Sequence, residues 1–168
     1  MLLYKEENLN FKNKKTTDCV IRAIAKAEGK DYKEVAQGLF DCFIKTGYAM
    51  NDKKCYEKYL EQLGWQKKKQ PRKRDNTKYL VGEANLIGFD RIMILSCAHH
   101  LTCKVGNAIV DIWDCRRKTI GNYWIKNNKN EGEWLWKTKK LLVKNARIED
   151  LLTRKLLVMQ FVKNIKNG

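Results

Sequence analysis

The sequence predicts an α+β domain, because its first half has the apolar spacing of helices and its second half has that of strands. Apolar residues recur every three or four positions over residues 18–63, whereas short β-like runs dominate residues 91–126. Helices that precede a set of antiparallel strands are typical of the α+β class. The 168 residues fit one such domain with an appendage.

Three helices are expected in the first half. The segment 18–27 is apolar around most of its circumference, which predicts a buried helix with Thr17 or Asp18 as its N-cap. The segments 31–46 and 52–63 each begin with a capping residue and are followed by a glycine. These signals predict two further helices.

Polar segments lie on either side of these helices. Residues 1–17 are rich in Lys and are expected to be extended. Residues 67–78, KKKQPRKRDNTK, are mostly Lys and Arg and contain the only proline of the chain, which predicts a surface loop. A short helix is expected over residues 79–88.

Several short strands are expected in the second half. The run 91–97 is typical of a strand. Two runs within residues 100–113 flank Gly106 and Asn107, a pair that favours a tight hairpin turn. Residues 119–126 supply another strand. Together these runs predict an antiparallel sheet.

The last part of the chain is expected to be an addition to this domain. Residues 1–126 hold all the elements named so far and form the predicted core domain. Residues 127–168 are basic and form a C-terminal extension. Within it, residues 147–166 have the apolar spacing of a closing helix, which we expect to pack on the same domain.

The sequence favours a cytoplasmic protein. No apolar run approaches the roughly 18 residues that a membrane helix needs, so no association with a membrane is expected. The first residues also lack the apolar stretch of a secretory signal. The six cysteines are then expected to be free thiols, because dense disulfides are typical of small secreted domains.

The formal net charge of +16 is large for a chain of this size. It favours contact with a polyanion such as nucleic acid, or with an acidic protein partner, although a solvated Lys-rich surface explains it equally well. The basic loop is the candidate nucleic-acid-binding segment. Its side chains are those of Lys67, Lys68, Lys69, Arg72, Lys73 and Arg74.

Cys19 stands at the expected start of the buried helix. Backbone N–H groups point outward at that end of a helix, and the helix dipole favours negative charge there. A thiol in this position has a lowered pKa and is more nucleophilic. The alternative is a structural cysteine in the core, since free cysteine is among the most buried residue types.

The two histidines, His99 and His100, begin an expected strand, and the following strand carries Asp111 and Asp114. A cysteine nucleophile needs a base, and the base needs a third group that orients it. A cysteine, a histidine and an aspartate on the next strand make one such set. The alternative is that the histidines are two polar residues at a strand start.

A zinc site is a rival use of this region. Cys97, His99 and Cys103 share strand parity, and Cys115 is near in sequence. Zinc accepts Cys and His ligands in tetrahedral geometry. The spacing, however, is not that of paired metal-ligand motifs, and side chains two and four apart on one strand diverge. We therefore expect neither a metal nor another cofactor.

Two segments resemble the papain-like cysteine peptidase superfamily: KTTDCVIRAIA at residues 15–25 and HHLTCKVGNAIVDIWDC at residues 99–115. More narrowly, the chain is similar to small uncharacterised proteins of phages and bacteria that carry DCVxRAIA and HLxxxxxGxxxDxWD segments. The resemblance covers about residues 13–126. It implies a papain-like fold and a cysteine-dependent hydrolase, or an acyl transferase, that acts on a peptide or amide bond.

The resemblance also implies roles for single residues. The nucleophile opens the central helix, which corresponds to Cys19, and the base opens a strand, which corresponds to His100. The carboxylate at the end of the next strand corresponds best to Asp114. The oxyanion-hole amide lies six residues before the nucleophile, where this chain has Asn13 in place of the usual Gln.

Strand parity leaves the choice of aspartate open. If the predicted turn has two residues, His100 shares a face with Asp111, while His99 shares a face with Asp114. A bulge near Trp113 would reverse this pairing. Asp111 as the third group and His99 as the base are therefore alternatives. The alternative function is a basic nucleic-acid-binding or partner-binding protein on the same fold with a vestigial site.

Overall fold

The computed structural model describes residues 1–88 and 92–126, which form an α+β arrangement of three α-helices and a six-stranded mixed sheet. The predicted α+β class is confirmed at this level. In chain order the elements are β1 (Leu3–Glu6), α1 (Cys19–Glu28), α2 (Tyr32–Thr46), α3 (Lys53–Gln62), β2 (Trp65–Lys68), the 3-10 helix η1 (Val81–Leu86), β3 (Ile92–Cys97), β4 (His100–Val105), β5 (Ala108–Asp111) and β6 (Tyr123–Lys126).

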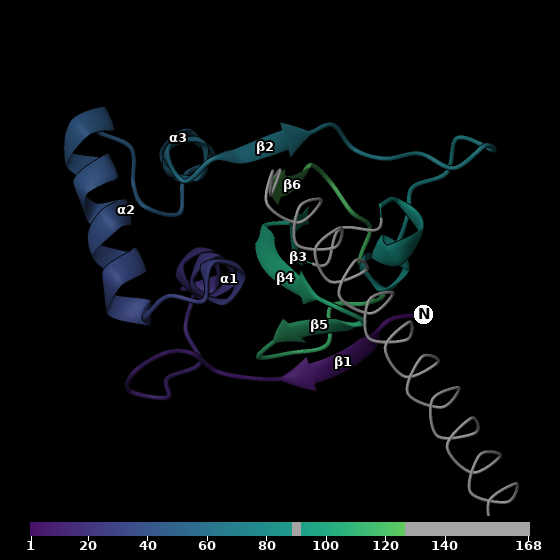
Figure 1. The fold of residues 1–168 in the computed structure, drawn as a ribbon, viewed down its shortest axis with the longest axis horizontal. Coiled ribbons are helices and arrows are strands. Elements are labelled where there is room, and N and C mark those ends of the chain that lie inside the picture. The colour runs from purple at the N-terminus through teal and green to yellow at the C-terminus, as the bar shows by residue number, and fades with distance from the viewer. Residues whose placement is uncertain (89–91, 127–168) are drawn as a thin grey trace, which may run out of the picture. The chain divides into compact units, whose positions relative to one another are not determined.

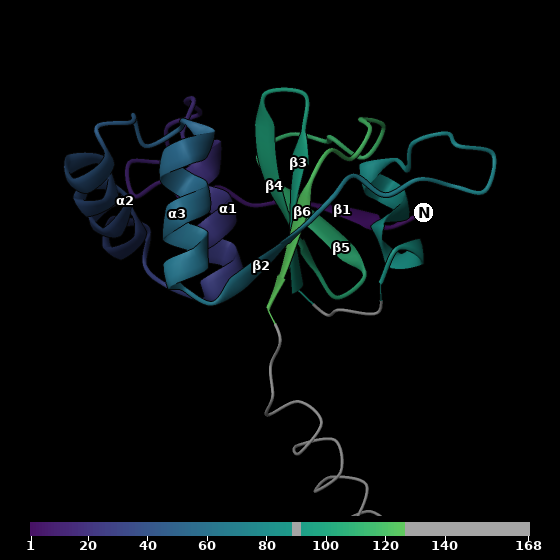
Figure 2. The same cartoon turned by 90° about the horizontal axis from the view of Figure 1, so that it is seen from above.

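Helix α1 is the central helix of the helical half. In Figure 1 it lies between α2 and strand β4, and Figure 2 shows the three helices on one side of the sheet. Val20 and Ile24 are buried on it, and Gly29 ends it with a φ of 64°, a conformation that glycine adopts without strain. All three predicted helices are confirmed, with their ends close to the predicted ones.

The sheet has the order β1-β5-β4-β3-β6-β2. Strands β4 and β5 form the predicted hairpin, with a two-residue turn that places Val105 opposite Ala108. Strand β3 pairs with β4 and β6 in antiparallel fashion. Strand β1, however, pairs with β5 in parallel, so the expectation of a purely antiparallel sheet is wrong. A parallel pair needs a long connection, and the chain between β1 and β5 provides it.

The edge strands β1 and β2 are the elements that the sequence did not reveal. Both have only four residues. Strand β2 includes Lys67 and Lys68, so the loop predicted over residues 67–78 is wrong for these two positions. Lysine is frequent on edge strands because its charge discourages pairing with another chain. The composition of β2 therefore resembles that of a loop.

Both faces of the sheet are buried. On the face toward the helices, Ile24, Leu39 and Leu60 are fully buried in one core together with Trp124 of β6. On the opposite face, a second core includes Val81 of η1, the short helix that was expected in this region. Packing on both faces holds β4 and β5 in place, and these strands carry the histidine and aspartate discussed below.

Residues 127–168, with the predicted extension and its closing helix, lie outside the described residues, as do residues 89–91. None of the described helices is long and apolar enough to cross a membrane. All six cysteines belong to the described part of the chain and are unpaired.

Candidate active site

Cys19 and His100 come together where the helical half meets the sheet. Cys19 is the first residue of α1, and His100 is the first residue of β4. Helix α1 packs against β4. Both side chains line one cleft, and they lie close enough for each to shift the pKa of the other. The fold therefore joins two residues that are far apart in the sequence.

The contact changes the pKa of both groups. Burial alone would raise the pKa of the Cys19 thiol, but hydrogen bonds from His100 and from the backbone of Leu101 lower it below its ordinary value. Burial alone would lower the pKa of the imidazole, but contacts with Asp111 and with the thiols of Cys115 and Cys19 raise it to about 11. The two shifts together favour a thiolate that faces an imidazolium.

Asp111, at the end of β5, is the carboxylate that contacts the imidazole. Its Oδ2 lies 2.6 Å from Nε2 of His100, and the two side chains are only 4% and 11% exposed. Because Val105 pairs directly with Ala108 across the turn, strand alternation brings His100 and Asp111 to the same face of the sheet. This is one of the two arrangements that strand parity left open.

Asp114, the aspartate chosen from the resemblance, does not contact His100. Its side chain is 42% exposed and forms a bidentate ion pair with Arg116, with Nη2 to Oδ2 at 2.7 Å and Nε to Oδ1 at 2.9 Å. Strand β5 ends at Asp111, before the predicted strand end, so Asp114 lies beyond the sheet. The choice of Asp114 is therefore corrected to Asp111.

His99, the alternative base, occupies the turn between β3 and β4. It is exposed and has a φ of 60°, a left-handed conformation that is uncommon for a residue other than glycine. The contacts with Cys19 and Asp111 belong instead to His100, the next residue along the chain.

Further contacts hold Asp111 in place. Its Oδ1 accepts a hydrogen bond from the backbone N–H of Ile112 at 2.8 Å, and Nη2 of Arg22 lies 3.9 Å from the same oxygen. Arg22 is buried and is also paired with Asp18, the N-cap of α1. These ion pairs connect the start of α1 with the end of β5. A charged residue within the apolar first half of this helix, four positions after Asp18, is the sequence signal that could have identified Arg22.

An open cleft of about 950 Å³ gives access to the thiol and the imidazole. Residues of both halves line it, among them Asn51 before α3 and Asn122 before β6. Trp113 also lines it, with its ring centroid 5.0 Å from that of His100. The tryptophan covers one side of the imidazole and limits the access of water to it. The cleft is large enough for a segment of a peptide.

Asn13 is not among the described residues that line this cleft. It is exposed and has a φ of 51°, and its side-chain oxygen accepts a hydrogen bond from Nδ2 of Asn8 at 3.2 Å. A turn closed by the bond from its N–H to the carbonyl of Asn10, at 2.7 Å, sets this position. The structure therefore places Asn13 outside the cleft in which an oxyanion hole was expected. The side-chain amides that do line the cleft are those of Asn51, Gln70 and Asn122.

One group of described residues has the donor atoms for a metal ion. The ligand atoms of His100, Asp111 and Cys115 lie within 4.8 Å of one another. Of the four residues weighed for zinc from the sequence, only Cys115 belongs to this group. Cys103, for example, is buried with its thiol toward the carbonyl of Lys104 at 3.7 Å. A metal at this group would compete with the imidazole contacts described above.

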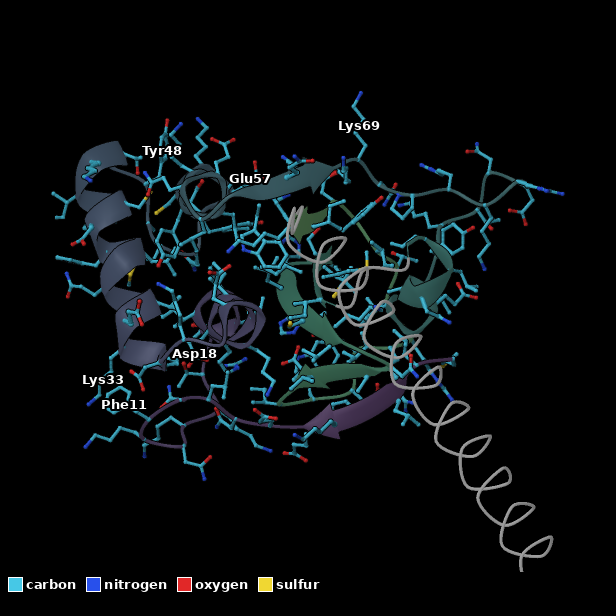
Figure 3. The ribbon with its side chains drawn as sticks, viewed as in Figure 1. Phe11, Asp18, Lys33, Tyr48, Glu57 and Lys69 are labelled. Carbon is cyan, nitrogen blue, oxygen red and sulfur yellow. The ribbon has the colours of Figure 1, made fainter. Side chains whose placement is uncertain are left out.

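The basic loop is a separate feature of the surface. Lys67 pairs with Glu57 at 2.7 Å, and Lys73 pairs with Glu83 at 3.0 Å. Figure 3 shows Lys69 pointing away from the sheet. Among the described residues that line the cleft, none belongs to the six basic side chains of this loop.

No family model, curated protein or solved structure matches this chain. The function is therefore argued from the geometry of the site. That geometry brings Cys19 and His100 together, replaces Asp114 by Asp111 and separates Asn13 from the cleft.

Proposed function

We propose that the protein is a cysteine-dependent hydrolase that cleaves a peptide or amide bond, or transfers the acyl group, through Cys19, His100 and Asp111. One observation carries the proposal: the imidazole of His100 lines the same open cleft as the Cys19 thiol, lowers the pKa of that thiol, and lies 2.6 Å from the buried carboxylate of Asp111. A nucleophile, a base and an orienting group in this order are the parts that nucleophilic catalysis needs.

In the proposed first step, the Cys19 thiolate attacks the carbonyl carbon of the substrate and forms a tetrahedral intermediate. The His100 imidazolium then gives its proton to the leaving amine, and a thioester remains on Cys19. Nε2 faces Asp111, which leaves Nδ1 for this proton transfer. In the second step, His100 takes a proton from water as the water attacks the thioester, and the acid and the free thiol are released.

Asp111 supports both steps as an orienting group. Its carboxylate fixes the plane of the imidazole and stabilises the positive charge that the ring carries before it donates its proton. The negative oxygen of the tetrahedral intermediate needs hydrogen-bond donors. The backbone N–H of Cys19 is suited to this, because the first N–H groups of a helix have no partner within the helix.

The arrangement also supports a papain-like organisation of the site. The nucleophile begins a central helix, and the base and the carboxylate follow on adjacent antiparallel strands. This order along the chain is the one implied by the sequence resemblance. Two residues differ from the roles that the resemblance implies: Asp111 takes the place of Asp114, and Asn13 lies outside the cleft. These differences do not change the position of Cys19 at the start of α1 or of His100 at the start of β4.

The proposal is tested by the rate at which iodoacetamide alkylates Cys19 between pH 5 and pH 10, in the wild type and in a His100→Ala variant. The lowered pKa of Cys19 and the raised pKa of His100 increase the fraction of the thiolate–imidazolium pair below the pH at which an ordinary thiol ionises. An ordinary thiol with a pKa of about 8.5 is almost fully protonated at pH 6. The wild type should therefore react at least about 10-fold faster than the variant at that pH.

The site of alkylation is read by mass spectrometry, and circular dichroism checks that the variant is folded. Rapid low-pH alkylation of Cys19 that disappears in the His100→Ala variant supports the proposal. Superimposable pH profiles would show that the two residues do not act as a pair, and the cysteine-hydrolase proposal would then fail.

The charge of the chain favours a second candidate function, the binding of a polyanion. Its support is the net charge of +16 together with six basic side chains outside the cleft, two on strand β2 and four on the loop that follows it. Binding to DNA or RNA should weaken steeply with salt, and replacement of the six residues by Ser should flatten that dependence. The absence of binding at low salt would exclude this function.

A further inference from the structure

A second, smaller recess opens beside the nucleophile. It measures about 310 Å³, and its apolar lining comes from Val20 and Ile21 of α1 and from Ala49 and Met50 before α3. Val20 and Asn51 line both this recess and the main cleft, so the two spaces lie next to each other. An apolar recess that opens into a polar cleft is the usual form of a site for one apolar side chain.

The recess has a fixed position relative to the reacting atom. Val20 and Ile21 directly follow Cys19 on the first turn of α1. A substrate side chain held there belongs to a residue close to the bond that the thiol attacks. The helix presents the thiol and the apolar wall together, so neither can move without the other.

One carboxylate borders the recess, but its charge is already paired. Asp18 is paired with Arg22, and its Oδ2 accepts hydrogen bonds from Nδ2 of Asn10 at 2.7 Å and from the hydroxyl of Tyr32 at 2.8 Å. Its side chain is buried, and Figure 3 shows it near the start of α1. Asp18 therefore does not compete for a cation on a substrate, and the remaining surface of the recess is apolar or neutral.

The main cleft carries positive charge. Lys15 and Lys53 line it, and among the described residues that line it there is no Asp or Glu. Lys15 is paired with Glu6 at 2.7 Å, whereas Lys53, at the start of α3, is exposed and forms no ion pair within the described part of the chain. A ligand that passes from the recess along the cleft therefore meets a cation that is available for an acidic group.

We propose that the site takes peptide segments in which an apolar side chain fills the recess and a nearby acidic side chain faces Lys53. This inference rests on the proposed function and adds the substrate class to it. Shape and apolar contact at the recess select the first side chain. Charge complementarity with Lys53 selects the second and disfavours basic peptides.

The test uses chloroacetyl dipeptide amides, whose chloromethylene carbon takes the place of the scissile carbonyl. The Cys19 thiolate displaces chloride and forms a thioether, so recognition is measured even without turnover. The four probes combine Leu or Ser with Glu or Lys. The Leu probes should react about 10-fold faster than the Ser probes. The Glu probes should react about two- to fivefold faster than the Lys probes, because Lys53 is exposed to solvent.

Two variants test whether the recess and Lys53 cause these preferences. Ala49→Trp fills the recess from an exposed position, so the ratio of Leu to Ser rates should fall to about one. Lys53→Glu should reverse the preference between Glu and Lys probes. Lys54→Glu is the matched control, because the neighbouring lysine contacts Tyr48 and is not among the described residues that line the cleft.

The outcomes separate this inference from the proposed function. Equal rates for Leu and Ser probes, or a Leu preference that survives Ala49→Trp, would overturn the recess as a subsite. Equal effects of Lys53→Glu and Lys54→Glu would overturn the charge preference. Iodoacetamide is too small to depend on the recess. If its pH profile still requires His100 while the probes show no preference, only the substrate inference fails.

Discussion

Cys19 and Cys55 both lie in the first turn of a helix and next to the helical core, yet their thiols have opposite properties. Cys55 is fully buried and points toward the carbonyl of Leu39 at 3.7 Å, and burial is the main cause that raises its pKa to about 11. Burial also acts to raise the pKa of Cys19, but the interactions with the His100 imidazole and with the backbone of Leu101 together lower it. A position at the start of a helix therefore does not by itself lower the pKa of a thiol. The contacts that the thiol makes with other residues determine that pKa.

The largest expected effect is a difference in reactivity between these two cysteines. At pH 7, iodoacetamide should alkylate Cys19 about 1,000-fold faster than Cys55, because Cys55 has almost no thiolate at that pH and lies away from solvent. Peptide mass spectrometry after timed quenching measures both rates in one sample. Comparable rates would show that the imidazole does not set the difference.

The next largest effect concerns the carboxylate that orients the imidazole of His100. Asp111→Asn should lower the alkylation rate of Cys19 at pH 6 by about 10- to 100-fold, because the imidazole loses its orienting carboxylate and much of the support for its positive charge. Asp114→Asn is the matched control and should change the rate less than about twofold, since Asp114 contacts Arg116 on the surface. A stronger effect at Asp114 than at Asp111 would contradict the observed register.

A thermodynamic effect follows from the same pair. Between the lowered pKa of Cys19 and about pH 9, folding shifts a proton from the Cys19 thiol to His100, so the free energy of unfolding gains no pH dependence from them in that range. Above pH 9 the unfolded thiol ionises, while His100 in the folded protein stays protonated up to about 11. Stability should therefore fall there, by at most about 1.4 kcal/mol per pH unit.

A Cys19→Ser variant tests whether the thiol compensates for the protonation of His100. It removes the thiol that compensates for His100, whose pKa is still raised by Asp111. Its stability relative to the wild type should therefore begin to fall once the pH rises above the lowered pKa of the wild-type Cys19 thiol, and so below pH 9. Urea unfolding at a series of pH values measures the difference. Parallel curves for the two proteins between pH 6.5 and 9 would show that no proton is shared in this way.

The smallest expected effect is that of the ring beside the imidazole. Trp113→Ala should slow the alkylation of Cys19 at pH 6 by about threefold, because water gains access to the contact between His100 and Asp111. Trp113→Phe keeps an aromatic ring there and should retain most of the rate. Equal losses in both variants would point to the indole N–H instead of the covering ring.

The parts of this fold that follow local rules were predictable. The helix starts at capping residues, the glycine stops and the turn at Gly106 and Asn107 depend on neighbours in the sequence. The edge strands β1 and β2 were not predictable, because their pairing partners β5 and β6 lie far along the chain. Their side chains are also largely polar, so no apolar alternation marks them.

The residues of the candidate site also divide into those that the sequence could predict and those that it could not. Cys19 at a helix start and His100 at a strand start could be named from sequence, and strand parity contained the correct aspartate as an alternative. Choosing Asp114 depended on where β5 ends, which is set by pairing with β1 and β4 and not by the strand's own residues. Asn13 was placed by counting back from Cys19, and an irregular turn does not preserve such a count.

The parallel pairing of β1 with β5 has a consequence for folding during synthesis. The backbone carbonyl of Asp111 accepts a hydrogen bond from the N–H of Glu7 at 2.9 Å. Strand β1 therefore cannot pair with β5 until most of the core has been synthesised. Cys19 leaves the ribosome early, whereas His100 and Asp111 leave late. During that interval the thiol lacks the partners that lower its pKa. Nascent and partly folded chains therefore carry an ordinary thiol at this position, and its pKa is lowered only when the sheet closes.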